Sequence, residues 1–90
     1  MTTLAGIENK IAGYIAENIL FVSKGYPYPL DASFLENGII DSMNVLELVM
    51  FVEENFQVHV DDAEIVPENF DSVQNLAAFI DKKQHLQGAL

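Results

Sequence analysis

The chain has 90 residues, 14 of them acidic and only four basic, which gives a formal net charge of −10. This length suits a single domain, and the charge excludes both a nucleic-acid-binding module and docking on an anionic membrane, because each needs a basic face. The absence of cysteine excludes disulfide bonds, a thiol nucleophile and a Cys-ligated zinc site. Neither a secretory signal nor a run of ~18 apolar residues is present, so we expect a soluble, cytoplasmic, monomeric domain whose partners are basic.

The first half of the chain combines one helical pattern with a long irregular segment. Apolar residues at steps of three and four predict a first helix over residues 3–21. The periodicity then fails over residues 22–41, where Gly25, Pro27 and Pro29 rule out a continuous helix. We expect this loop to be ordered because apolar residues tie it to the core, namely Leu30, Phe34, Leu35, Ile39 and Ile40.

The second half of the chain predicts further helices. Helical periodicity covers residues 42–56, and a short helical turn over residues 61–66 is stopped by Pro67. A last helix follows, with Asp71 as its N-cap and Gln74 at capping-box spacing. The predicted fold is all-α: a small four-helix bundle of three longer helices and one short helix, with a long ordered loop between the first and second helices. Residues 1–83 form the domain, and residues 84–90 are expected to be a flexible C-terminal tail.

The second predicted helix has two unlike faces when its residues are placed at about 100° each. One face is uniformly apolar and predicts the core contact; it consists of Val45, Leu48, Val49, Val52 and Phe56. The other face carries three apolar residues among three glutamates, namely Met43, Leu46 and Met50 among Glu47, Glu53 and Glu54. Surface methionines suit contact with differently shaped partners. We therefore interpret these six residues as a docking surface and call it the docking face. The alternative is that its three apolar side chains pack under the long loop; under either interpretation the glutamates stay exposed.

Ser42 stands at the start of this helix, directly after Asp41. Either residue can be the N-cap, and a serine at this position can also carry a phosphate that the helix dipole favours. The two roles are compatible. No histidine, lysine or cysteine lies near Ser42 in the sequence, so Ser42 is unsuited to act alone as a nucleophile, and a partner enzyme must supply the base.

Residues 38–43, Gly-Ile-Ile-Asp-Ser-Met, together with the docking face that follows them, resemble the superfamily of acyl, aminoacyl and peptidyl carrier proteins. The resemblance covers nearly the whole chain. It implies that Ser42 carries 4′-phosphopantetheine, which a phosphopantetheinyl transferase moves from coenzyme A with the help of Mg²⁺. The terminal thiol of this arm then holds an acyl or aminoacyl group as a thioester. Asp41 could lie beside the transferase's metal or cap the helix, and the two roles are compatible.

Two features set this sequence apart within the superfamily. Met43 stands where leucine is most common, and residues 66–72 resemble stand-alone carriers that adenylate-forming ligases serve. The resemblance therefore implies a non-enzymatic carrier in fatty acid, polyketide or nonribosomal peptide biosynthesis. Its partners would be the transferase, an adenylate-forming acyl or aminoacyl ligase or an acyltransferase, and a downstream synthase or condensing enzyme. Asp41 and the docking face would contact them.

Two other interpretations concern the function and a metal site. An acidic, all-helical interaction adaptor without a prosthetic group is the alternative function, and phosphopantetheinylation separates it from a carrier. The acidic segment of residues 61–64 lacks the ligand spacing and central glycine of an EF-hand loop, so we expect a solvated turn and no metal site there.

Overall fold

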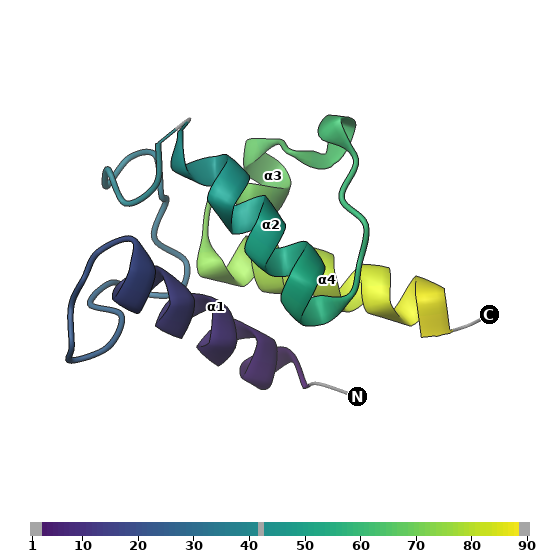
Figure 1. The fold of residues 1–90 in the computed structure, drawn as a ribbon, viewed down its shortest axis with the longest axis horizontal. Coiled ribbons are helices and arrows are strands. Elements are labelled where there is room, and N and C mark those ends of the chain that lie inside the picture. Colours follow the sequence, from purple (N-terminus) through teal and green to yellow (C-terminus); the bar gives the residue numbers. More distant parts are fainter. Residues whose placement is uncertain (1–2, 42, 89–90) are drawn as a thin grey trace.

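Helices account for all the regular secondary structure in the part of the chain that the structure, a computed structural model, describes: residues 3–41 and 43–88. Along the chain these are α1 (Leu4–Asn18), α2 (Asn44–Phe56), a 3₁₀ turn η1 (Asp62–Glu64), α3 (Pro67–Phe70) and α4 (Val73–Gly88) (Figure 1). The prediction of three longer helices, one short helix and a long connecting loop is confirmed. None of the helices in the described residues is long and apolar enough to cross a membrane.

Helix α1 is capped at both ends by local hydrogen bonds. The Thr3 hydroxyl accepts from the Gly6 N–H at 3.0 Å, which satisfies one of the amide groups left free at a helix start. The helix ends at Asn18, three residues before the predicted end. The reason is that Phe21 adopts a left-handed conformation with φ of 57°. The main chain then turns back, and the Val22 N–H donates to the Ala16 carbonyl at 2.8 Å.

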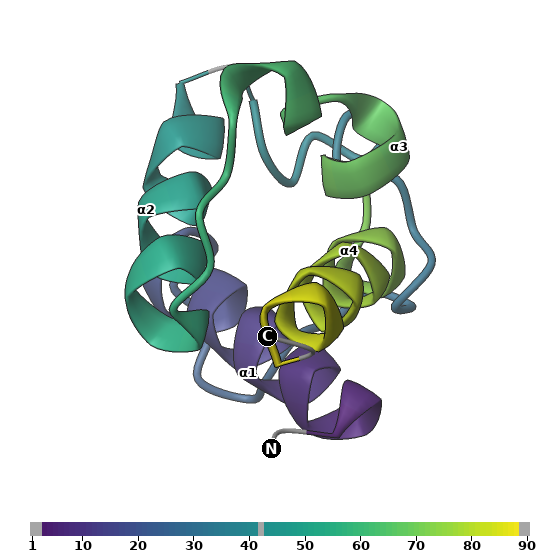
Figure 2. The same ribbon diagram turned by 90° about the vertical axis from the view of Figure 1, so that its right-hand side faces the viewer.

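The core lies where the three long helices and the loop meet. Figure 2 shows α4 nearly end-on, with α1, α2 and α3 arranged around it. Of the loop residues expected to anchor it, Phe34, Ile39 and Ile40 are buried, whereas Leu30 and Leu35 are exposed, so the expectation is wrong for those two. The largest fully buried side chains are Ile7, Ile11, Ile15, Phe34, Leu48, Val52, Val73, Leu76 and Ile80.

The junction between α3 and α4 corrects one prediction. Ser72, not Asp71, caps α4, because the Ser72 hydroxyl accepts from the Asn75 N–H at 3.0 Å. The Asp71 carboxylate instead accepts from the Ser33 hydroxyl at 2.6 Å and the Leu35 N–H at 3.1 Å. Asp71 therefore clasps the long loop to the start of α4, and we call this pair of hydrogen bonds the Asp71 clasp.

Two further differences concern the second half of the chain. Pro67 ends the predicted turn and also begins α3 at the first helical position, where a missing N–H costs nothing. The predicted tail is helical as far as Gly88, the end of α4. A reason is that the Gln84 side-chain amide donates to the Phe56 carbonyl at 3.3 Å, which ties this part of α4 to the end of α2.

Candidate functional site

Asp41 fixes the start of α2. Its Oδ1 accepts from the N–H groups of Met43 at 2.9 Å and Asn44 at 3.0 Å, and its carbonyl accepts from the Val45 N–H at 3.1 Å. The Asp41 side chain therefore supplies capping hydrogen bonds at this helix start. The helix itself begins at Asn44, two residues after the predicted start. Ser42, the predicted attachment site, lies outside the described residues; Asp41 and Met43 on either side of it in the sequence are exposed.

The docking face is exposed where it is apolar. Met43, Leu46 and Met50 are 80%, 62% and 60% exposed. The alternative, that they pack under the long loop, is therefore wrong. A partner that covered them would gain the hydrophobic stabilisation that the isolated chain forgoes.

The three glutamates of this face divide into two kinds. Glu47 and Glu54 are exposed, as expected. Glu53 is half-buried, because its carboxylate accepts from the Val60 N–H at 2.9 Å and lies 3.5 Å from the His59 Nδ1. Glu53 thus also holds the segment after α2 against the helix. Its role toward a partner stays a prediction, whereas Glu47 and Glu54 are free to meet one.

The core face of α2 is as predicted, and one contact beside it was missed. Leu48, Val49, Val52 and Phe56 are buried, and Val45 packs against the core. Phe51, assigned to neither face, stacks on Tyr14 of α1 with ring centroids 4.0 Å apart. Burial, followed by the nearby carboxylates of Glu47 and Glu54, raises the pKa of Tyr14.

An apolar hollow of about 190 Å³ opens beside Asp41. Sequence reasoning did not find it, because its walls come from the long loop, α2, the segment before α3, and α3. The Asp71 clasp borders the hollow, since Leu35 and Asp71 both line it. Its apolar lining consists mainly of Phe34, Leu35, Ile40, Val45, Ile65, Val66, Pro67 and Phe70.

The acidic turn after α2 is tied to α4. The Lys83 ammonium lies 2.9 Å from the Glu64 carboxylate, which also accepts from the Asp61 N–H at 3.0 Å. The Asp61 N–H first, and then Lys83, lower the pKa of Glu64. Among the side chains that the structure describes, no group of three or more His, Cys, Asp or Glu residues is arranged to hold a metal ion.

The amino-acid sequence was compared with those of known proteins and protein families. No family model matches the chain, but curated relatives do. The acyl carrier protein of Akkermansia muciniphila is 37% identical over 78 residues, which cover 87% of this chain and 92% of the relative. That of Nitratidesulfovibrio vulgaris is 36% identical over 78 residues, covering 87% and 97%. That of Onion yellows phytoplasma is 43% identical over 53 residues, covering 59% and 67%.

The sequence similarity to these acyl carrier proteins thus extends over most of this small helical bundle. The chain belongs to the acyl carrier protein family. It is accordingly an acyl carrier and not an enzyme, which agrees with the family resemblance that residues 38–43 carry.

Proposed function

We propose that the chain carries 4′-phosphopantetheine on Ser42 and holds an acyl or aminoacyl group on it as a thioester, which it shuttles between biosynthetic enzymes. The observation that carries the proposal is the cap at Asp41, directly before Ser42, on a helix whose outer face is apolar and acidic. When bound, the arm would supply the thiol that this cysteine-free chain lacks.

The residues around Asp41 fit such a group. The Asp41 carboxylate is engaged by two N–H groups of the helix start, which reduces its repulsion of a neighbouring phosphate. The positive end of the α2 dipole favours negative charge at this place. The apolar hollow beside Asp41 offers a surface on which a hydrocarbon group is removed from water.

The apolar and the acidic residues of the docking face would then have different tasks. Met43, Leu46 and Met50 would form the apolar contact with the transferase, with the ligase or acyltransferase that loads the cargo, and with the synthase that consumes it. Glu47 and Glu54 would attract and orient basic residues at the rim of that contact. The transferase would supply the base and the Mg²⁺, whereas this chain would contribute the position of the serine and the recognition surface.

The test of attachment is the intact mass of the protein after incubation with coenzyme A, Mg²⁺ and a broad-specificity phosphopantetheinyl transferase. We expect the mass of one phosphopantetheine to be added to the wild type and none to Ser42→Ala. Ser42→Ala should stay folded by circular dichroism, because Asp41 supplies the cap. Ser23→Ala is the matched control and should be loaded normally. If the wild type gains no mass, the acidic adaptor becomes the better interpretation. If the arm maps to another serine, the assignment of the attachment site to Ser42 is wrong.

The test of the docking face compares two charge reversals of equal size. Glu47→Lys should lower the transferase kcat/KM by up to about tenfold at low salt and less at high salt, because rim charges act mainly on association. Asp81→Lys on α4, outside the face, should have little effect. Met50→Ala should weaken the complex with little change in salt dependence. Equal losses for Glu47→Lys and Asp81→Lys would mean that only net charge matters, and the docking face would have to be abandoned.

A further inference from the structure

Phe21 has a left-handed backbone that ends α1, but nothing in the fold requires an aromatic side chain at this position. Its side chain is 81% exposed, so it takes no part in the core. Its φ of 57° lies in the left-handed region, which favours glycine or asparagine at the end of a helix. A large aromatic side chain at such a position exposes apolar surface and strains the backbone at once. Such an outlier points to a role outside folding.

The pairing of α1 with α2 locates Phe21 along the bundle. The Lys10 ammonium lies 5.5 Å from the centre of the Phe56 ring, and the Tyr14 and Phe51 rings stack at 4.0 Å. Later residues of α1 thus pair with earlier residues of α2, so the two helices run antiparallel. The C-terminal end of α1, followed by Phe21, therefore lies toward the end of the bundle where α2 begins (Figure 1). Asp41 is at that end.

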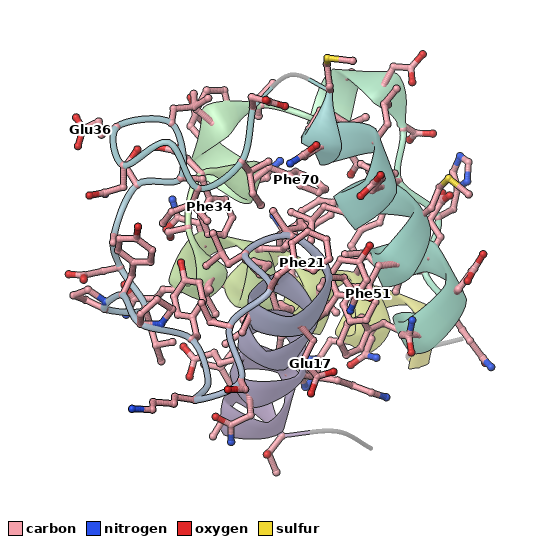
Figure 3. The ribbon with its side chains drawn as sticks, turned by 60° about the vertical axis from the view of Figure 1, so that its left-hand side comes forward. Glu17, Phe21, Phe34, Glu36, Phe51 and Phe70 are labelled. Atoms are coloured by element: carbon pink, nitrogen blue, oxygen red, sulfur yellow. The ribbon has the colours of Figure 1, made fainter. Side chains whose placement is uncertain are left out.

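The surface next to Phe21 is hollowed, and a second hollow borders the docking face. A hollow of about 510 Å³ lies between Phe21, the α1 residues Gly13, Ala16 and Glu17, and the start of the long loop. A second hollow of about 410 Å³ lies between Tyr14 and α2, where Met50 and Phe51 form its apolar part. Their linings include two consecutive residues of α1, Gly13 in the first hollow and Tyr14 in the second. Figure 3 labels Phe21, Glu17 and Phe51, which mark this side of the molecule.

The charges that border the two hollows indicate the kind of partner that fits this surface. Glu17 borders the first hollow, and Glu47 and Glu54 border the second. With a net charge of −10, a second copy of the chain and an anionic membrane are both repelled. A protein with basic residues around an apolar contact is attracted. An enzyme that modifies the residue after Asp41 has to bind at the end of the bundle where α2 begins.

We infer that Phe21 is a docking contact for the phosphopantetheinyl transferase, which extends the α2 docking face across Tyr14 and Phe51 onto the end of α1. The inference rests on the proposed attachment at Ser42. In the complex, the exposed ring of Phe21 would be covered by an apolar part of the enzyme, while basic residues of the enzyme meet Glu17, Glu47 and Glu54. The strain at Phe21 is then the cost of presenting an aromatic ring at this position.

The experiment measures kcat and KM for loading by a broad-specificity transferase with coenzyme A, together with the Tm of each variant. Phe21→Gly should leave the Tm unchanged or higher, since glycine relieves the left-handed conformation. It should lower kcat/KM by about fivefold or more, mainly through KM, as the loss of an apolar anchor does. Phe21→Tyr keeps the ring and should load like the wild type. Leu4→Ala, which shortens an exposed apolar side chain at the other end of α1, is the matched control and should also load normally.

Three outcomes would overturn the inference. The first is that Phe21→Gly loads as well as the wild type. The second is a fall of several degrees in its Tm, which would assign Phe21 a structural role. The third is a wild-type dimer in light scattering that Phe21→Gly disrupts, which would make a second copy the occupant. A wild type that gains no mass at all refutes the proposed function itself, so the two failures are distinguishable.

Discussion

The Asp71 clasp allows a prediction of a local and measurable loss of stability. Asp71→Ala removes the acceptor for the Ser33 hydroxyl at 2.6 Å and for the Leu35 N–H at 3.1 Å. A hydrogen bond to a charged group contributes about 1.5–3 kcal/mol, and water replaces part of that here, because the clasp is only half-buried. We therefore expect a total loss of about 2–3 kcal/mol. For a domain of this size each kcal/mol lowers the Tm by about 4–8 °C.

The loss should be confined to the loop. Main-chain bonds from Phe34 N–H to the Asp71 carbonyl and from Gln74 N–H to the Leu30 carbonyl remain in the variant, so the loop stays attached at both sides of the clasp. Amide hydrogen exchange should therefore speed up at Leu35 and leave the first turn of α4 protected. Urea denaturation gives the total free energy of unfolding for comparison.

Ser72→Ala is the matched control, because it removes the cap of α4 and leaves the clasp intact. It should lower the free energy of unfolding by about 1 kcal/mol. It should also speed up amide exchange at Asn75, whose N–H donates to the Ser72 hydroxyl. The reasoning fails if Asp71→Ala costs no more than Ser72→Ala and loosens the first turn of α4. Asp71 would then be the helix cap that capping-box spacing predicts.

Three other predictions concern charge and protonation. Added NaCl should raise the Tm, because it screens the repulsion among the excess negative charges; a midpoint that stays flat or falls across a salt series would contradict this. Burial first, and then Tyr28, raise the pKa of Tyr26 to about 12 from its ordinary value of 10.0, so stability should fall as pH rises between these values, where the unfolded chain loses the proton and the folded chain keeps it. The Tyr26 hydroxyl is buried and finds no hydrogen-bond partner among the described residues, so Tyr26→Phe should be no less stable at neutral pH and should lack this contribution to the alkaline decline in urea denaturation. The pKa of Glu64 is lowered, so its stabilisation is present above the unfolded pKa and lost as pH falls through the folded one. Glu64→Gln should therefore lower the Tm at pH 7 and have little effect at about pH 3, where equal losses at both values would exclude an ionic contribution.

Helix α2 was predictable from the sequence because both of its faces are periodic. A side chain every three or four residues points the same way, so the buried set and the exposed set separate on a helical wheel without knowledge of the fold. That separation placed Met43, Leu46 and Met50 on one face, and the structure, not the periodicity, shows that the loop leaves them exposed. Helical periodicity does not specify residues between the faces, and Phe51, which stacks on Tyr14, was therefore missed.

Two differences from the predicted fold have another physical cause, which is interaction between residues distant in sequence. Capping-box spacing favours Asp71 as a cap, yet its partners Ser33 and Leu35 stand 38 and 36 positions earlier. Gln84 extends α4 through Phe56, 28 positions earlier. The end of α1 was placed too late for another reason: the left-handed conformation of Phe21 is one that its residue type disfavours.

The strongly acidic composition connects the fold of this carrier with its recognition of partners. Exposed apolar side chains such as Met43, Met50 and Phe21 would favour self-association, and the net charge of −10 opposes it by keeping copies apart. The same charge attracts partners with a basic rim and destabilises the isolated fold by repulsion. Salt should therefore act in two directions at once, raising the Tm while slowing the reaction with the transferase. Both responses have one physical cause, which is the screening of the protein's negative charges by salt.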